Sequence, residues 1–280
     1  MHAALFLLIP AIILLALIAL HWYFHIPASD SHKTPADYHL SFKELAIPTV
    51  KQKRLLAWFI PAQPEAAVVI IVHGWGSRSA QMLPLALPFR RQGLNVILFD
   101  ARSHGSSDRD TFASLPRFAE DIQKVINYTR NELKLNNKLI LLGHSLGGSA
   151  SLYAASKRHD IDAVISIAAF AHPRLMMQRA LHRLPNMLVQ PVLLYVQWLI
   201  GHSFDEIAPL SSIKKITCPV LIAHGSEDTT VPFQDALLIH ESNPRSQLIK
   251  IPGANHGSVE KLKSHGDLLI KFLKENNLIT

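Results

Sequence analysis

One serine lies between glycines in the segment 143–147, which has the sequence Gly-His-Ser-Leu-Gly. The apolar run 138–142 precedes it, and the helix-compatible run 149–156 follows it. A G-x-S-x-G motif between a strand and a helix holds its serine on a sharp turn, where the hydroxyl projects alone and the glycines avoid collisions. The motif therefore predicts nucleophilic attack by Ser145. The same turn would place the backbone N–H of Leu146, at a helix N-terminus, beside the carbon under attack.

A serine hydroxyl is a weak nucleophile, so a base and an orienting acid must lie near it in space. Both are present in loops that follow apolar segments: Asp228 comes after 219–223, and His256 comes after 247–251. The chain order Ser145, Asp228, His256 is the order of the Ser-Asp-His hydrolases that carry this serine motif. All three follow predicted strands, and open α/β sheets bind ligands at the carboxyl ends of their strands.

A tetrahedral intermediate needs a second backbone donor for its negative oxygen. The early apolar run 66–72 ends in His-Gly-Trp-Gly at positions 73–76, where two glycines allow the backbone to turn inward. We predict the backbone N–H of Trp75 as this donor. Its indole ring either forms a wall of the substrate pocket or simply packs at a glycine turn.

Other polar residues near these motifs are expected to have structural roles. Asp100, Arg102 and His104 follow another predicted strand, where hydrogen bonds that hold loops together are the expected role. Glu227, the neighbour of Asp228, remains an alternative orienting acid. The chain has 16 His and 1 Cys, but no His-Glu-x-x-His motif and no pair of cysteines, so we expect no metal site.

The elements that must position these residues alternate between strand-like and helix-like patterns, as in a mostly parallel sheet. Central strands are predicted over 66–72, 95–99, 138–142, 163–169 and 219–223, and a further strand over 247–251. The segments 38–47 and 54–60 are predicted to form an antiparallel hairpin at the sheet edge. Helices are predicted over 81–92, 115–135, 147–158, 234–241 and 259–276.

One interval, 171–217, is too long for a simple connection between parallel strands and predicts an inserted structure. Within it, 173–184 is a basic and apolar helix candidate, and 187–200 is apolar nearly all round. A helix of the second kind must be buried against the core, cover a pocket or lie at a membrane surface. The three possibilities stay open at this stage.

The N-terminal segment 3–20 contains eighteen uncharged and mostly apolar residues, which as a helix would span about 27 Å. That length nearly crosses the hydrocarbon core of a bilayer, and the aromatic residues at 22–24 suit the headgroup region. We predict a single membrane anchor, with a cleaved secretory signal or a helix buried against the domain as the alternatives. Lys33 is the only basic residue near the span, so the side of the membrane stays open.

The amino-acid composition and charge narrow the classes of protein to which this chain can belong. Of 280 residues, 49% are hydrophobic and 18% charged, which excludes a disordered chain. The net charge is +7, but the basic residues are scattered and no basic arm with interleaved aromatics is present. We therefore expect no nucleic-acid partner, and a basic protein beside an anionic membrane is favoured.

The segments HGWG at 73–76, DARSHGSSD at 100–108, GHSLGG at 143–148, GSEDTTVP at 225–232 and GANH at 253–256 occur in the order of a known family. The chain resembles the α/β-hydrolase superfamily, in the serine-hydrolase branch with monoacylglycerol-lipase-like and serine-aminopeptidase-like proteins. The resemblance implies a mostly parallel eight-stranded sheet with helices on both faces, a variable lid after the sixth strand and no cofactor. The branch often has glycine at the position of Ser103.

The expected organisation is an N-terminal transmembrane helix or signal at 1–25, a linker at 26–37 and an α/β-hydrolase domain at 38–280 with a helical lid insertion at 171–217. The function predicted is a serine hydrolase that cleaves carboxylic esters, esterase-like or lipase-like, through a Ser-His-Asp triad and an acyl-enzyme. Its substrate is expected to be a small ester or lipid-like molecule. A peptidase, amidase or thioesterase on the same triad and a non-catalytic membrane-tethered module remain alternatives.

Overall fold

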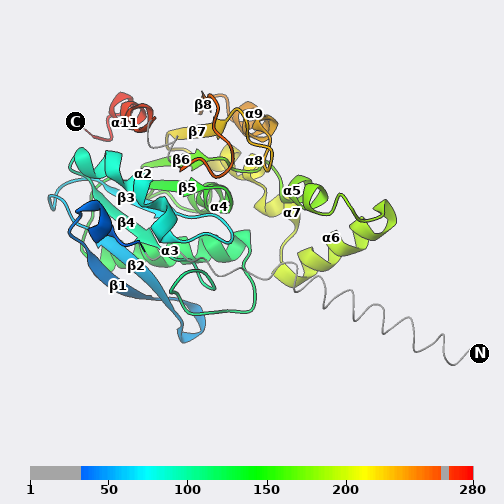
Figure 1. Ribbon diagram of the computed structural model, residues 1–280, viewed down its shortest axis with the longest axis horizontal. Helices are drawn as coiled ribbons and strands as arrows, with labels where there is room; N and C mark the ends of the chain where they lie inside the picture. Colours follow the sequence, from blue (N-terminus) through cyan, green and yellow to red (C-terminus); the bar gives the residue numbers. More distant parts are fainter. Residues whose placement is uncertain (1–32, 260–264, 280) are drawn as a thin grey trace, which may run out of the picture.

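The computed structural model describes residues 33–259 and 265–279 as a single mixed sheet flanked by helices (Figure 1). The strands are β1 (Lys43–Pro48), β2 (Arg54–Ile60), β3 (Val68–Val72), β4 (Asn95–Phe99), β5 (Leu139–His144), β6 (Ala163–Ile167), β7 (Val220–Gly225) and β8 (Gln247–Ile251). Their order across the sheet is β1-β2-β4-β3-β5-β6-β7-β8. Strand β2 pairs antiparallel with both neighbours, and all other pairs are parallel. The predicted mostly parallel eight-stranded sheet is therefore confirmed.

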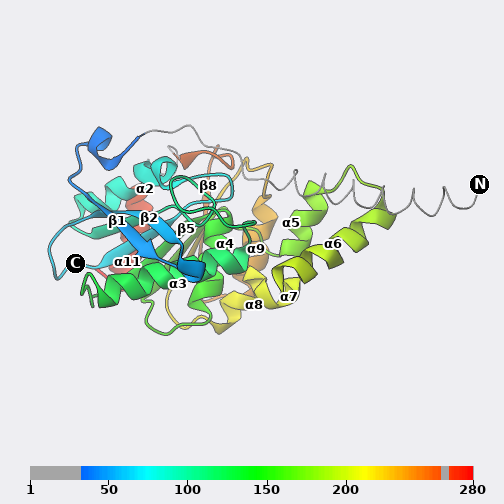
Figure 2. The ribbon, with the colours of Figure 1, turned by 90° about the horizontal axis from the view of Figure 1, so that it is seen from below.

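The central strands are apolar because helices cover both faces of the sheet. Every residue of β3, β4, β5 and β6 is buried. On one face the core includes side chains of α3 (Leu115–Asn131), α4 (Leu146–Ala155) and α9 (Phe233–Ser242). On the other face it includes side chains of α2 (Ser79–Arg91) and α11 (Gly266–Glu275), and Figure 2 shows both layers.

The boundaries of some predicted elements differ from the structure. The predicted edge strand at 38–47 begins only at Lys43, and a 3-10 helix, η1 (Pro35–Tyr38), precedes it because Pro35 suits the first turn of a helix. Another 3-10 turn, η2 (Val50–Gln52), joins β1 to β2. The helix predicted at 259–276 corresponds to α11, although residues 260–264 lie outside the described ones.

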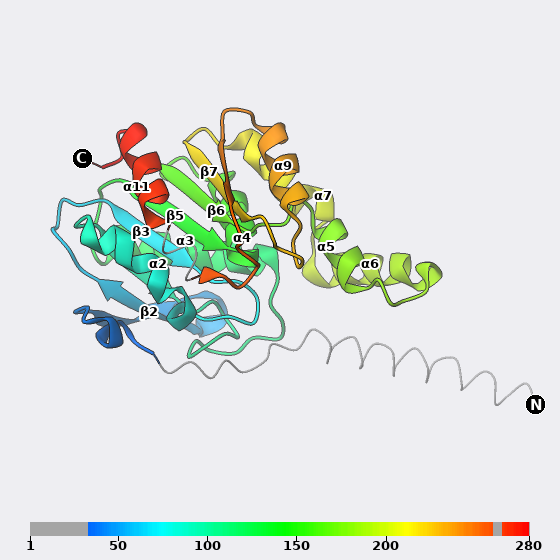
Figure 3. The same cartoon turned by 45° about the horizontal axis from the view of Figure 1, so that its top comes forward.

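The predicted insertion between β6 and β7 consists of helices. These are α5 (Pro173–Ala180), α6 (Asn186–Ile200), α7 (Phe204–Ile207), α8 (Pro209–Ser212) and the 3-10 helix η3 (Ile213–Lys215). Helices α5 and α6 project from one end of the sheet, beside α7 (Figure 3). The two long helical candidates of the sequence thus correspond to α5 and α6.

The predicted membrane anchor at 1–25 lies in residues 1–32, outside the described part of the chain. Among the described residues, none of the helices combines the length and apolar character that crossing a bilayer requires. The anchor therefore stays a prediction.

Candidate active site

Ser145 occupies a sharp turn between β5 and α4, with φ 55° and ψ −119°. Residues other than glycine rarely adopt such a positive φ, so the surrounding backbone must hold Ser145 in this conformation. The Ser145 N–H donates to the Ile167 carbonyl at the end of β6 (2.8 Å). A methyl group at Gly143 would collide with the backbone of Gly147 and Gly148, so the turn depends on a glycine at that position.

The three predicted polar side chains lie in one hydrogen-bonded line. Ser145 Oγ is 2.9 Å from His256 Nε2, and His256 Nδ1 is 2.7 Å from Asp228 Oδ2. Asp228 follows β7 and His256 follows β8, so both loops leave the same edge of the sheet as the Ser145 turn. The carboxylate beside His256 is that of Asp228, rather than the alternative Glu227.

Asp228 is held as a carboxylate. Burial of its side chain would raise its pKa, but hydrogen bonds from His224, His256 and the Val231 N–H outweigh burial and hold the pKa well below its usual range. Its second oxygen, Oδ1, accepts the N–H groups of Thr230 (3.0 Å) and Val231 (2.8 Å). The ring of His256 therefore faces the fixed negative charge of Asp228.

His144, the residue before Ser145, contacts the loop that carries His256. Burial lowers the pKa of His144 to about 4, assisted by the nearby His256, so the ring is neutral at physiological pH. Its Nε2 lies 2.8 Å from the backbone carbonyl of His256, which can only accept, so the Nε2 proton is donated to it. Sequence reasoning missed this contact, although adjacency to the serine was a signal.

The predicted second oxyanion donor lies in the loop 73–76 after β3. A methyl group at Gly74 would come within 3.1 Å of Ser145 Cβ, so this loop runs directly beside the serine. Trp75 is 42% exposed there. Leu146 is the first residue of α4, and the first N–H groups of a helix have no acceptor within it. Donation by Trp75 and Leu146 to an oxyanion stays a prediction.

Two buried neutral histidines orient this loop. Because His73 Nε2 accepts the Ala101 N–H (2.9 Å), its proton lies on Nδ1, which donates to the Gly74 carbonyl (2.7 Å). His104 Nε2 accepts the Gly76 N–H (3.1 Å). Burial lowers the pKa of both rings, that of His104 to about 3, so both remain acceptors. The peptide between Gly74 and Trp75 is thus fixed at its carbonyl.

The loop after β4 has the structural role that the sequence predicted. The buried Asp100 carboxylate accepts both the N–H and the hydroxyl of Ser79 at the start of α2 (2.7 Å each). It also accepts the Ser106 N–H (2.8 Å). Asp100 and His104 therefore join the loop to neighbouring segments.

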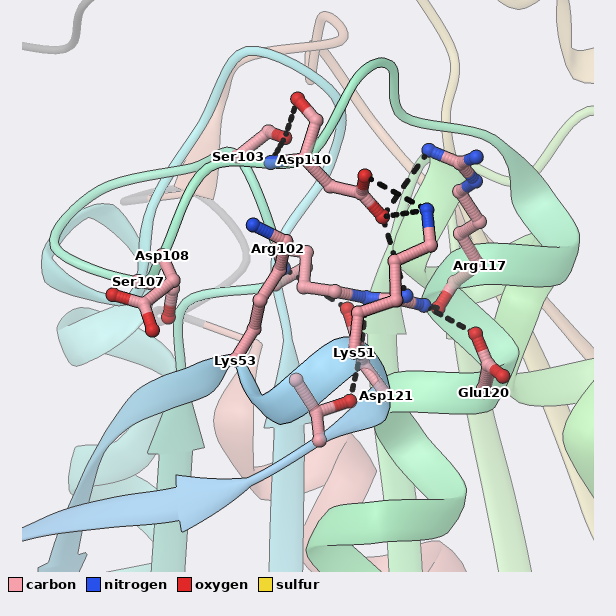
Figure 4. Close-up of polar contacts among 12 residues, drawn as sticks. Lys51, Lys53, Arg102, Ser103, Ser107, Asp108, Asp110, Arg117, Glu120 and Asp121 are labelled. Atoms are coloured by element: carbon pink, nitrogen blue, oxygen red, sulfur yellow. Dashed lines mark hydrogen bonds and ion pairs between the residues drawn. The ribbon is translucent and has the colours of Figure 1, made fainter.

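Arg102 is the buried centre of an ionic cluster (Figure 4). Its guanidinium lies 2.7 Å from Asp121, 2.5 Å from Glu120 and 3.5 Å from Asp110. We call these four residues the Arg102 cluster. Lys51 also reaches Asp110, at 3.1 Å, so the cluster ties the loop to α3 and to the β1–β2 connection.

A cleft of about 730 Å³ opens above Ser145 and His256. Its walls include the loop 74–77, the first half of α2, and Lys33 and Tyr38 from the beginning of the described chain. No described residue of 171–217 lines it. The cleft volume suits a small organic ligand. A role of the insertion as a lid stays a prediction.

The sheet order and the serine turn are those of an α/β hydrolase. A family model described as "Serine aminopeptidase, S33" matches residues 63–214, which is more than half of the chain. The chain therefore belongs to the serine aminopeptidase S33 family of the α/β-hydrolase superfamily.

Similar proteins occur in bacteria, yeast and archaea. The chain is 27% identical to YfhR of Salmonella typhimurium, over 96% of this chain and 93% of that protein. It is 25% identical to the membrane protein YNL320W of Saccharomyces cerevisiae, over 91% of this chain and 85% of that protein. The solved structure of the Pyrococcus furiosus esterase Pf2001 superposes with a TM-score of 0.72 at 21% identity, covering 89% of this chain and 98% of that one. That likeness supports the fold.

Proposed function

We propose that the protein hydrolyses carboxylic esters, with Ser145 as nucleophile, His256 as general base and Asp228 as the acid that orients His256. The observation that carries this proposal is the hydrogen-bonded line from Ser145 Oγ through His256 to Asp228, in which Ser145 and His256 line the cleft. A nucleophile, a base and an orienting acid in this arrangement perform acyl transfer on several unrelated folds.

In this mechanism His256 Nε2 takes the proton of Ser145 as the serine oxygen attacks the carbonyl carbon of the ester. The backbone N–H groups of Trp75 and Leu146 stabilise the negative oxygen that forms. His256, now positively charged next to Asp228, gives its proton to the leaving alcohol. Water then attacks the acyl-enzyme with the same base and releases the acid.

The lining of the cleft favours an ester over the N-terminal peptide bond of an aminopeptidase substrate. Such a substrate carries a free ammonium group, which binds best beside a carboxylate. Among the described residues, no Asp or Glu lines the cleft, whereas Lys33 does. The esterase named among the solved structures supports the same choice. A thioesterase or amidase would use the same groups and remains the second candidate.

We further propose that the segment 3–20 anchors the protein in a membrane as a single span and that the substrate is lipid-like. The apolar length of this segment and the printed name of the yeast relative, a membrane protein, support this location. An alkaline carbonate wash of membranes from expressing cells tests it. The full-length protein should stay in the pellet, and a shortened soluble product would contradict the anchor.

Side-by-side turnover of p-nitrophenyl esters and aminoacyl p-nitroanilides tests the reaction. We expect ester turnover to exceed amide turnover and to disappear in Ser145→Ala. Ser242→Ala is the matched control, because Ser242 lies on α9 outside the cleft and, within the described part of the chain, its hydroxyl donates to the Leu238 carbonyl of the same helix. Preferred cleavage of the anilide would instead favour a peptidase, and equal turnover in Ser145→Ala would refute the mechanism.

A further inference from the structure

Exposed large apolar side chains of the described chain concentrate on one part of the insertion. Eight such side chains are exposed in residues 33–259 and 265–279, and six of them lie between Leu184 and Leu199. Met187 is 81% exposed and Trp198 is 76% exposed. Single exposed apolar residues are ordinary, but a contiguous group of this kind marks an interaction surface.

Three of the five exposed large apolar residues of α6 share one stripe. Met187, Leu194 and Trp198 are spaced seven and four residues apart, which places them on one stripe of the helix. The opposite stripe contains the buried Leu193 and the partly buried Val196, which pack against the core. Packing within the described chain therefore accounts for the inner face of α6 and leaves its outer face to another partner.

Positive charge borders this outer face. Residues 173–204 contain three arginines and neither Asp nor Glu. Arg179 pairs with Asp235 of α9, but Arg174 extends to the side chain of Gln190 on α6 (3.2 Å). Arg183 lies in the turn between α5 and α6. An apolar face that carries tryptophan and is bordered by arginines matches the interface of an anionic bilayer.

We infer that the outer face of α6 inserts into the headgroup region of an anionic lipid bilayer. This inference rests on the proposed membrane location and adds a second contact to the proposed anchor. A single span does not fix which side of the domain faces the lipid, whereas a second contact does. No described residue of α6 lines the cleft, so the contact orients the enzyme rather than covering its active site.

A second copy of the chain is the main competing occupant of this face. A twofold interface brings the same patch of both subunits together. Arg174 and Arg183 of one copy would then lie in the same interface as those of the other, and the nearest acidic residues along the chain, Asp205 and Glu206, already contact His172 and His202. Like charges across an interface oppose association, whereas anionic lipid headgroups neutralise them.

Site-specific fluorescence in vesicles tests the inference. The full-length chain has a single cysteine, so Cys218→Ala provides a background for Leu194→Cys on α6 and for Leu238→Cys on α9. Leu238 is a matched control, because it is also an exposed leucine on a helix (38%, against 56% for Leu194). Each variant is labelled with an environment-sensitive dye and reconstituted into phosphatidylcholine vesicles with and without phosphatidylglycerol.

We expect a blue-shifted emission at position 194, quenched several-fold more strongly by a nitroxide-labelled lipid than the emission at position 238. Phosphatidylglycerol should strengthen the quenching, and Arg183→Glu should weaken it. Water-like emission at both positions in protein that floats with the vesicles would overturn the inference. So would a shift at 194 that depends on protein density and not on lipid quencher, which would indicate a second copy.

Two controls separate this result from the other proposals. Flotation of the vesicles reports whether the protein binds the membrane at all, and failure to float would overturn the inference together with the anchor. Ester turnover of both labelled variants is measured in parallel. Retained turnover with water-like emission at 194 would leave the proposed hydrolase intact and refute only the α6 contact.

Discussion

The Asp228–His256 pair and the Arg102 cluster both bury a carboxylate against a nitrogen base, but they differ in the base and in its access to solvent. Histidine is the side chain that most often transfers protons in enzymes, and the side chain of His256 is 23% exposed at the cleft. Arginine serves in proteins as a fixed cation for ion pairs, and the side chain of Arg102 is 4% exposed. The first pair can take part in proton transfer, whereas the second can only hold the fold.

The two carboxylates also differ in pKa. Burial raises the pKa of Asp121 to about 6, although Arg102 and the hydroxyl of Thr49 lower it. In Asp228 the hydrogen bonds outweigh burial, and the pKa falls. A perturbed pKa alone therefore does not distinguish an active site from a structural cluster. The distinguishing feature is that Asp228 contacts a histidine that lines the cleft, whereas Asp121 contacts a buried arginine.

Replacement of the orienting acid should have the largest effect. Asp228→Asn keeps the shape of the side chain but removes the charge that fixes the ring of His256, so kcat for ester hydrolysis should fall by a factor on the order of 10⁴. Steady-state kinetics and a thermal melt check this. A loss of cooperative melting, or kcat within tenfold of the wild type, would contradict the assigned role.

The opposite pattern is expected for the Arg102 cluster. Arg102→Met leaves the buried Asp121 without its cation, and the free energy of unfolding should fall by about 3–5 kcal/mol. Urea unfolding measures this change, while active-site titration gives the kcat of the folded fraction, which should change little. Unchanged stability would show that the cluster contributes nothing measurable.

A smaller effect is expected for His144. His144→Leu removes the donor to the His256 carbonyl, and a hydrogen bond worth about 1.4 kcal/mol corresponds to a tenfold fall in kcat with little change in KM. His144→Gln restores a donor and should recover part of the loss. Equal kcat in the two variants would show that the contact does not position His256.

The pH dependence of stability is the most gradual effect, because it develops over several pH units. Burial lowers the pKa of His104 to about 3 and that of His144 to about 4, from an ordinary value of 6.5. Below pH 6.5 the unfolded chain binds protons at these residues that the native state does not, so stability falls as pH drops from 6.5 to about 4. Each ring contributes a slope of about 1.4 kcal/mol per pH unit.

Asp121 opposes this trend, because its raised pKa makes the native state bind the extra proton between pH 3.8 and about 6. Its contribution to stability is present at low pH and lost as pH rises through about 6. Asp121→Asn should therefore steepen the acid loss seen in urea unfolding at several pH values. A shallower acid loss in this variant would contradict the assignment.

The sheet and the three polar side chains could be predicted because their signals are local. Alternating apolar segments determine the strands, and residues directly after parallel strands meet at one edge, which brought Ser145, Asp228 and His256 together. The N-terminal hairpin was placed less well, because the turn around Pro35 competes with the strand pattern of 38–47.

The remaining contacts depend on tertiary packing, which the sequence does not encode locally. The donation from His144 to His256 joins residues more than a hundred positions apart. The number of carboxylates around Arg102 follows from where α3 crosses the loop. The sequence of α6 is apolar on all sides, which predicts burial but does not indicate which face of the helix packs against the core. Trp198 lies on the face that the core does not cover.

Labelling with a fluorophosphonate probe, followed by peptide mapping, tests the central claim most directly. The probe phosphonylates a serine that a neighbouring base has activated, and fluoride leaves as the P–O bond forms. We expect one modified peptide, containing Ser145, in the wild type and none in Ser145→Ala. An unreactive wild type, or a label on another residue that persists in Ser145→Ala, would contradict the proposed hydrolase.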